Sequence, residues 1–291
     1  MWRLYGKKRR ENSPSNILRI LYVCLIAVGC LLIFTASRDL LTDEREYSAA
    51  QLEYIQLREM YPIVSEYRAG KYAPTPPRED DSGLVVHPPT LIASPTPNAR
   101  SRVSNSDYQI RVPVRRDPAD PIVGLVEINP DFVGWISIEG VIDYPVVQGR
   151  NNSRYLNTTF TGQRNASGTI FVDSRQPEGF SGDVCIIYGH NMRDGSMFAP
   201  LKQYLSAAFM EANPNITVVT SDGELLDYLI FAARQTDIRD AAYALNFKSA
   251  AAGTGAFSKA PDGARSFLLL STCTNSPDKE DRLLVYAALI D

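Results

Sequence analysis

The order of apolar and polar positions divides the chain into four stretches of different character. An uncharged, almost wholly apolar run of 17 residues, 20–36, comes first. Residues 38–69 then carry apolar side chains at a loose spacing of three to five, which is typical of a helix. Large apolar residues become sparse from 71 to 120, and from residue 122 short apolar runs alternate with turn residues. We expect an apolar helix, a helical stalk, an extended linker and one folded domain.

The C-terminal stretch has the pattern of a β protein. Its apolar runs are short, rich in β-branched and aromatic residues, and bounded by turn-forming residues. They are residues 135–138, 143–147, 169–172, 184–188, 216–220, 225–231, 266–273 and 282–290. Only 197–205 and, more weakly, 241–259 are expected to be helical. Eight or so strands without regular alternation of strand and helix predict a mainly β fold, one closed or nearly closed eight-stranded β-barrel with a few added helices.

A basic cluster precedes the uncharged run. Residues 1–19 hold six basic side chains and one acid. At about 1.5 Å per residue, a helix of 17 residues reaches ~25 Å, near the lower limit for crossing a bilayer. Basic residues favour the cytoplasmic side, so we predict a cytoplasmic segment 1–19, a single transmembrane anchor 20–37 and an extracellular remainder. A cleaved signal peptide is the alternative, because Thr35-Ala36-Ser37 is small, although signal-peptide apolar regions are usually shorter.

Two accessory segments are expected between the anchor and the barrel. The first, 38–70, is a juxtamembrane helical stalk, a solvated spacer that Pro62 kinks or divides unless it opens a second helix. The second, 71–120, is a linker, because ten of the nineteen prolines lie between Pro74 and Pro121. The barrel then occupies 121–291.

Composition and charge narrow the possible functions. The chain is 44% apolar and 22% charged, which excludes wholesale disorder. Its net charge of −3 divides into +5 for residues 1–19 and −8 for the rest, and an acidic body argues against nucleic-acid binding. Four cysteines and two histidines are too few for a disulfide scaffold. Since the folded region lacks metal-ligand spacing, no metal and no cofactor are expected.

Three side chains in the folded region could form a reactive site. His190 follows one predicted strand, Cys273 ends another and Arg282 begins the last. A turn at 277–281 lets the last two strands form a hairpin, which brings Cys273 close to Arg282. A thiol beside a base or cation can become a nucleophile, and an arginine can stabilise an oxyanion. From spacing alone, a structural histidine, a surface arginine and a Cys185–Cys273 disulfide remain alternatives, although Cys185 is better explained as a small core residue.

The motifs around these residues resemble those of sortases. The motifs that carry the resemblance are Tyr188-Gly-His-Asn-Met192, Leu270-Ser-Thr-Cys-Thr274 and Arg282-Leu-Leu-Val285, in this order. Further motifs are similar to class B: Ile128-Asn-Pro-Asp-Phe-Val-Gly-Trp-Ile136, Ile142-Asp-Tyr-Pro-Val-Val-Gln-Gly149, Tyr155-Leu156, Gly168-Thr-Ile-Phe-Val-Asp173 and Met197-Phe-Ala-Pro-Leu-Lys202. The resemblance covers residues 122–291.

This resemblance implies a cysteine transpeptidase of the bacterial cell surface. Cys273 would be the nucleophile, His190 the general acid and base, and Arg282 the oxyanion or substrate clamp. The thiolate would cleave a C-terminal sorting motif of a secreted protein and form a thioacyl-enzyme. An amine of a peptidoglycan precursor or a pilin would then release the product as a new amide.

The resemblance also implies a substrate groove. Asn152 matches an asparagine that class B members carry before their Tyr-Leu pair, and Leu156 and Ser271 are further candidates for substrate binding. Asn151 departs from the family, which commonly has aspartate there. Two other functions remain open at this point: a cysteine protease that uses water as acceptor, and a catalytically inactive adhesion or scaffold barrel.

Overall fold

The structure is a computed structural model of the chain. The described residues are 15–72, 117–176, 179–180, 182–245, 255–264 and 266–290, with side chains from residue 21 onward except at 36–47. Most of the predicted cytoplasmic segment and most of the predicted linker therefore lie outside the described residues. The chain divides into two compact units, Met1–Leu52 and Glu53–Asp291, and each is described by itself.

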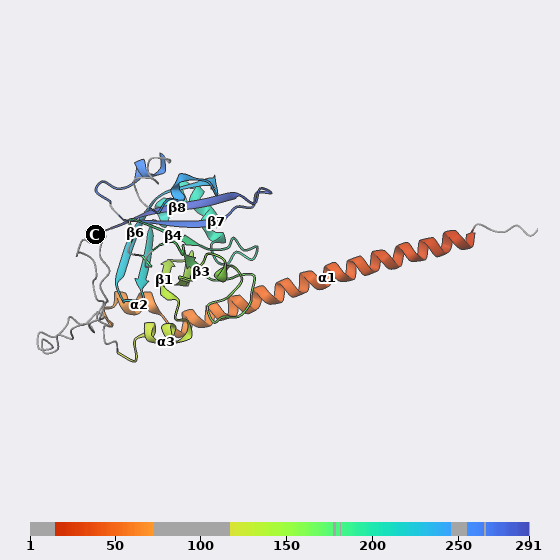
Figure 1. Cartoon of the computed structure of the whole chain (residues 1–291), viewed down its shortest axis with the longest axis horizontal. Helices are drawn as coiled ribbons and strands as arrows, with labels where there is room; N and C mark the ends of the chain where they lie inside the picture. Colours follow the sequence, from red (N-terminus) through yellow and green to blue (C-terminus); the bar gives the residue numbers. More distant parts are fainter. Residues whose placement is uncertain are drawn as a thin grey trace, which may run out of the picture. The chain divides into compact units, whose positions relative to one another are not determined.

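The first unit contains most of α1 (Ser15–Met60), the helix drawn in red to orange in Figure 1. Its large apolar side chains between 21 and 34 are exposed: Leu21, Tyr22, Val23, Leu25, Ile26, Val28, Leu31, Leu32, Ile33 and Phe34. Within the described residues, we find no helix with the length and apolar character needed to cross a membrane. The predicted anchor, 20–37, extends at both ends beyond residues 21–35, the part of it in which side chains are described.

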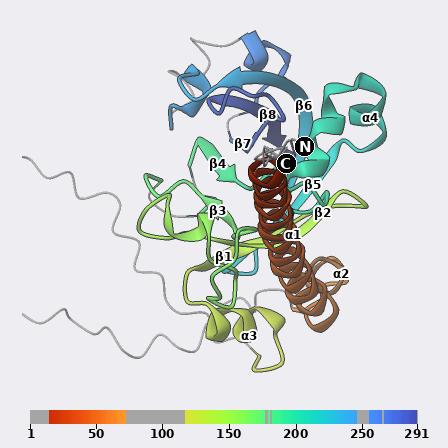
Figure 2. The ribbon, with the colours of Figure 1, turned by 90° about the vertical axis from the view of Figure 1, so that its right-hand side faces the viewer.

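The second unit is built around a closed barrel of eight strands (Figure 1, Figure 2). The strands are β1 (Phe132–Ile138), β2 (Ile142–Val147), β3 (Ile170–Val172), β4 (Val184–Tyr188), β5 (Asn215–Thr220), β6 (Leu225–Asp237), β7 (Phe267–Cys273) and β8 (Asp281–Leu289). Around the barrel they follow the order β1-β2-β3-β4-β7-β8-β6-β5. The closed eight-stranded barrel predicted from the sequence is confirmed, and each predicted strand overlaps one of these.

Two strand pairs bring the ends of β4 and β7 and the start of β8 to the same edge of the barrel. β4 and β7 are parallel, with Tyr188 beside Ser271. β7 and β8 are antiparallel, with Cys273 beside Arg282. Because parallel neighbours end at the same edge of a sheet, His190, which follows β4, leaves the sheet at the edge where Cys273 ends β7.

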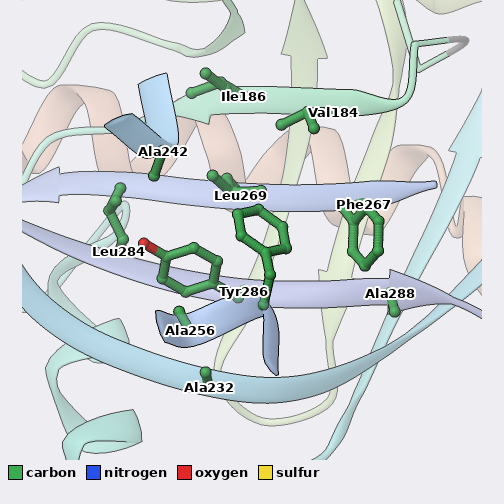
Figure 3. Packing of buried hydrophobic residues seen from close by; sticks show 11 residues of the cluster. Val184, Ile186, Ala232, Ala242, Ala256, Phe267, Leu269, Leu284, Tyr286 and Ala288 are labelled. Carbon is green, nitrogen blue, oxygen red and sulfur yellow. The ribbon is translucent and has the colours of Figure 1, made fainter. Parts of the chain in front are cut away.

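Strands β4, β7 and β8 are almost entirely buried along their length. Burial on both faces explains why their sequences are continuous apolar runs rather than alternating ones. The cluster on one face, drawn in Figure 3, includes Val184, Ile186, Ala232, Ala242, Ala256, Phe267, Leu269, Leu284, Tyr286 and Ala288. Ala242 and Ala256 belong to the short 3-10 helices η3 (Ala241–Tyr243) and η4 (Gly255–Lys259), so these turns pack against that face. Burying each large side chain there contributes roughly 1.5–3 kcal/mol.

One helix lies where the sequence predicted neither a helix nor a strand. α3 (Pro121–Ile128) is capped by the carboxylate of Asp120, which accepts a hydrogen bond from the Ile122 amide at 3.0 Å. Pro121 occupies the first helical position, where its fixed φ suits a helix and its missing N–H costs nothing. An Asp-Pro pair is thus the local signal for this helix, whereas its apolar run resembles a strand.

The remaining helices differ in part from the sequence-based expectation. The helix predicted at 197–205 is the 3-10 helix η2 (Ala199–Leu205). The stretch predicted at 241–259 contains η3 and η4, with 246–254 outside the described residues. α4 (Ala207–Ala212) and η1 (Arg154–Leu156) were not predicted. The expectation of only two helical stretches is therefore wrong.

Residues after Leu52 pack as part of the folded unit. α1 ends at Met60, and Pro62 is the N-cap of α2 (Ile63–Arg68), so the proline opens a second helix. Tyr54, Ile63 and Tyr67 are buried, and the Tyr54 hydroxyl donates to the Gly168 carbonyl at 2.5 Å. A solvated spacer was expected here, whereas these residues cover the barrel.

Candidate active site

Cys273 and Arg282 meet at the turn end of the last hairpin. Cys273 is the last residue of β7 and is exposed, whereas the six residues before it are buried. Its direct cross-strand partner is Arg282. The predicted hairpin and the predicted proximity of these two residues are therefore confirmed.

The Arg282 side chain is held by the turn that precedes it. Its Nη1 donates to the Lys279 carbonyl at 2.6 Å and to the Asp281 carbonyl at 2.9 Å. Neutral carbonyl acceptors orient the guanidinium without cancelling its charge. The charge can therefore act on a group that binds beside Cys273.

His190 reaches the same place from β4. Continuing the β4–β7 register by two residues sets His190 opposite Cys273, and the Gly189 amide still donates to the Ser271 carbonyl at 3.2 Å. The imidazole Nε2 lies 2.8 Å from the Leu156 carbonyl. A carbonyl only accepts hydrogen bonds, so Nε2 carries the proton in this arrangement.

Gly189 makes this approach possible. A Cβ built on it would lie 2.6 Å from both Ile170 Cδ1 and Phe198 Cγ. Only a residue without a side chain fits between the end of β4 and these two neighbours. The glycine of the Tyr-Gly-His motif is thus explained by packing beside the histidine.

A cavity of about 240 Å³ joins all six predicted site residues. The predicted residues that line it are Asn152, Leu156, His190, Ser271, Cys273 and Arg282. Residues that were not predicted complete the lining: Phe171, Tyr188, Gly189, Ile238, Tyr243 and Thr272. The cavity combines an exposed thiol, an imidazole and a guanidinium with a largely apolar and aromatic wall.

The three candidate binding residues are fixed in different ways. Asn152 Oδ1 accepts from the Ser174 amide at 2.7 Å, and the Ser271 hydroxyl lies 2.8 Å from the Tyr243 hydroxyl. Leu156 is 37% exposed, so its side chain is accessible, while its carbonyl contacts His190. Asn152 and Ser271 therefore stabilise the cavity wall, and Leu156 presents apolar surface to it.

Asn151, the position that departs from the family pattern, has a local role. Its Oδ1 accepts from the amides of Ser153 and Arg154 at 2.9 and 3.0 Å. These bonds satisfy the donors at the start of η1. The asparagine thus stabilises the turn that leads to Leu156.

Sequence reasoning missed a buried acid behind the cavity. Asp173 is fully buried and binds Arg175 through two side-chain bonds of 2.9 and 2.7 Å. Its Oδ2 also accepts from the Tyr188 hydroxyl at 2.8 Å. Burial alone raises the pKa of Asp173, but the hydrogen bonds from Arg175, Tyr188 and Asn152 outweigh it and lower the pKa to about 2. Asp173 is therefore ionised and holds Tyr188 in the wall.

The aromatic wall extends from Tyr188 to Tyr243. Their rings are stacked, with centroids 6.4 Å apart and planes 11° apart. Burial, and then the charge of Asp173, raise the pKa of Tyr188, so its hydroxyl stays protonated. An Asp-x-Arg sequence after one strand and a tyrosine near the end of the next is the only local signal for this arrangement.

The other cysteine of the barrel is structural. Cys185 is buried and free, and burial raises its pKa to about 12. Cys273 is also free. The Cys185–Cys273 disulfide held open above is therefore absent, and the interpretation of Cys185 as a small core residue agrees with its burial. Across the described residues, no group of three His, Cys, Asp or Glu side chains could hold a metal ion.

Comparisons with known proteins agree on one family. The family model of the sortase domain matches residues 136–290, a little over half of the chain. Sortase B of Listeria monocytogenes is 40% identical over 105 residues, which cover 36% of this chain and 43% of that protein. The chain thus spans less than half the length of this curated relative.

Solved structures extend the agreement to the fold. Sortase B of Clostridium perfringens is 33% identical, with a TM-score of 0.51 over 58% of this chain and 99% of that chain. A class B sortase of Streptococcus pyogenes is 28% identical, with a TM-score of 0.52 over 58% of this chain and 97% of that chain. Together with the cavity that unites Cys273, His190 and Arg282, these matches show that the chain belongs to the sortase family and that its relatives are of class B.

Proposed function

We propose that this chain is a cysteine transpeptidase that cleaves a C-terminal sorting motif and joins the new carboxyl end to an amine. The observation that carries the proposal is the cavity in which an exposed thiol, an imidazole and an arginine converge. Membership of the sortase family supports it, because sortases are cysteine transpeptidases.

In the first step, the Cys273 sulfur attacks the carbonyl carbon of the scissile peptide bond. The thiol proton passes to His190, the C–S bond forms, the C–N bond breaks, and His190 gives that proton to the leaving amine. Because the Leu156 carbonyl binds Nε2, we assign the proton transfer to Nδ1 of His190. Arg282 stabilises the negative charge that develops on the carbonyl oxygen.

In the second step, an acceptor amine attacks the thioester carbon. The new C–N bond forms, the C–S bond breaks, and the amine proton passes to His190 while the sulfur leaves as thiolate. A thioester is reactive enough for this exchange without a metal or a nucleotide. A cysteine protease would use water in place of the amine.

The proposed substrate is an extended peptide, and the proposed acceptor is an amine of a peptidoglycan precursor or a pilin. The aromatic and apolar wall of Tyr188, Tyr243 and Leu156 suits peptide side chains. A class B relative from Streptococcus pyogenes is described as involved in pilus biogenesis, and the Staphylococcus aureus sortase B structure contains substrate. Asn152 and Ser271 line the same cavity and remain candidates for binding the peptide.

We also infer that residues 20–37 anchor the chain in the cell membrane, with the barrel outside. The uncharged run and the six basic residues before it support this topology. The exposed apolar side chains of α1 between 21 and 34 support it as well, because an isolated helix in water does not present apolar residues on all sides. Membrane fractionation tests it: the full chain should remain in the pellet after alkaline extraction, and release into the supernatant would contradict the anchor.

A peptide library tests the transpeptidase activity. The full chain is incubated with the library, with and without glycine as added amine, and the products are weighed by mass spectrometry. We expect amide adducts only when glycine is present, and an acyl group on Cys273 when it is absent. Cys273→Ala should abolish both products, whereas Cys185→Ala, the matched control, should retain both. Cleavage without any adduct would identify a hydrolase, and activity in Cys273→Ala would disprove the assignment.

A further inference from the structure

A second cavity, of about 210 Å³, also opens beside Cys273. Cys273 and Thr272 are the two residues that line both cavities. None of the residues discussed above as substrate-binding candidates lines the second one. The thiol therefore stands between two separate spaces.

The strand register places the second cavity on the opposite face of the hairpin. Thr272, Leu283 and Gln235 are direct cross-strand neighbours on β7, β8 and β6, and all three line the second cavity. The next cross-strand pair, Cys273 and Arg282, lines the first. Side chains of successive residues point to opposite faces of a sheet, so Leu283 and Gln235 face the second cavity and Arg282 faces the first, while Thr272 and Cys273 lie at the boundary and line both.

The second cavity has a cationic and polar lining. Among the residues that the structure describes, Lys202 from η2 is the one charged residue of its lining. Lys202 is exposed, and no ion pair to it occurs among the described residues. Across the cavity, the Asn191 side-chain amide donates to Asn275 Oδ1 at 2.8 Å and joins the loop after His190 to the loop after Cys273. The lining offers a positive charge with no lining carboxylate to neutralise it.

One polar group at the boundary of the two cavities has no partner. Thr272 is only 4% exposed, and within the described part of the chain its Oγ1 makes no hydrogen bond. Leaving a buried hydroxyl unpaired is costly, so such a group usually meets a ligand or water.

On the basis of the proposed function, we propose that the second cavity binds the acceptor, and that Lys202 selects amines carried by a molecule that also bears a carboxylate. The acyl chain of the thioester occupies the first cavity, so the amine reaches the thioester carbon from the second. The lysine charge attracts the carboxylate. The same charge disfavours the protonated amine, which cannot attack, and favours the neutral one, which can.

Two acceptors that differ in the carboxylate test this inference. The full chain is given one cleavable library peptide and either glycine or glycinamide, and the rate of amide formation is compared with the rate of peptide cleavage. For each protein, the value obtained with glycine is divided by the value obtained with glycinamide. The two amines differ in basicity, but this difference is the same for every protein and cancels when the ratios are compared. Lys202→Gln should lower the glycine-to-glycinamide ratio roughly two- to fivefold, the effect of one exposed charge pair.

Three further variants sharpen the test. Lys202→Arg should preserve the ratio, and Lys202→Glu should lower it further than Lys202→Gln. Lys259→Gln, which removes a lysine lining neither cavity, should leave the ratio unchanged. Thermal melting shows whether each of the four variants folds, and the rate of peptide cleavage without acceptor is measured in each as the reference for its own rate of amide formation.

The outcomes separate this inference from the proposed function. If the acyl-enzyme forms and amides appear, but the ratio in Lys202→Gln equals that of the unaltered protein, the acceptor assignment is wrong and the transpeptidase remains. If no acyl-enzyme forms in the unaltered protein, the proposed function fails and the acceptor site fails with it.

Discussion

Cys273 and Arg282 are cross-strand partners at the end of the β7–β8 hairpin, and no described residue forms an ion pair with this arginine. Its guanidinium is held by the carbonyls of Lys279 and Asp281 instead. Backbone pairing fixes the position of the charge, and neutral acceptors leave that charge available. Both features suit a group that stabilises an oxyanion beside the thiol.

Arg282→Ala should lower the rate of peptide cleavage about 100- to 1,000-fold, the usual loss when one oxyanion donor is removed. Arg282→Lys keeps the charge but not the planar fork of donors, so its loss should be smaller. Single-turnover cleavage of a library peptide measures both. The melting temperature should change little, because, among the described residues, the side chain hydrogen-bonds only to carbonyls of the turn.

Arg239→Ala is the control for this prediction. Arg239 is exposed, pairs with Glu280 on the same turn, and lines neither cavity. Its removal changes the net charge equally but should alter cleavage less than about twofold. Equal losses in the two alanine variants would mean that Arg282 acts only through general attraction of the substrate.

Thiol labelling should separate the two cysteines of the barrel. Cys273 is exposed, whereas Cys185 is buried and burial raises its pKa to about 12. Iodoacetamide at pH 8 should therefore modify Cys273 in the folded protein and reach Cys185 only in denaturant. Peptide mapping by mass spectrometry locates the label. Rapid labelling of Cys185 in the folded protein would contradict its place in the core.

The sequence predicted the barrel well because strand burial leaves a local record. Each of the eight strands contains a short apolar run, and β7 and β8 are largely continuous runs because both faces are covered. Helix α3 was missed because its apolar residues resemble a strand, although Asp120 and Pro121 signal a helix start. The packing of Tyr54 on Gly168 joins positions 114 residues apart, which no local pattern reveals.

Asp173→Asn should destabilise the fold in a pH-dependent manner. The pKa of Asp173 is lowered to about 2, below the ordinary value of about 3.9, so folding favours the ionised form. That stabilisation is fully present above the ordinary pKa and is lost as the pH falls toward 2. The free energy of unfolding of the variant should be lower by roughly 2 kcal/mol at pH 5–7, and the difference should shrink between pH 4 and 2.

Urea unfolding at pH 7, 5 and 3 measures this difference. Asp227→Asn is the control, because it removes a carboxylate that pairs with Arg68 at 2.8 Å on the surface. Such a pair contributes at most about 1 kcal/mol. If the free energies of unfolding of the unaltered protein and of Asp173→Asn differ by the same amount at pH 7, 5 and 3, the ionised Asp173 is not the source of that difference.

The same substitution should affect the cavity. Asp173 accepts from the Tyr188 hydroxyl, and Tyr188 stacks on Tyr243 in the cavity wall. Loss of this bond loosens the wall without touching the thiol. The KM for a cleaved peptide should therefore rise severalfold while kcat stays within about twofold. A fall in kcat with unchanged KM would mean that Asp173 acts on the reacting groups instead.

The site was only partly predictable for a physical reason. The predicted hairpin placed Cys273 beside Arg282, whereas His190 joined them only through the resemblance to sortases, because the parallel pairing of β4 with β7 is not visible in the sequence. Asp173 acts through Arg175 and Tyr188, and the second cavity depends on the row Thr272–Leu283–Gln235, which three different strands supply. Such cross-strand relationships depend on register, which a single sequence does not specify.

Gly168→Ala should disturb His190 from a distance. Gly168 has φ +57°, and a Cβ there would lie 2.3 Å from the Tyr155 carbonyl oxygen and 2.8 Å from that of Leu156. The Leu156 carbonyl accepts the hydrogen bond of His190 Nε2, so moving it displaces the imidazole. We expect a loss of at least about 2 kcal/mol of stability and a slower cleavage step.

Gly162→Ala is the matched control, because Gly162 also has a positive φ, +89°, but nothing lies within 4 Å of its added Cβ. Backbone strain alone affects Gly162→Ala, so its cleavage rate, measured well below the melting temperatures of both variants, should match that of the unaltered protein. Equal rates in the two variants would show that the Leu156 carbonyl does not position His190.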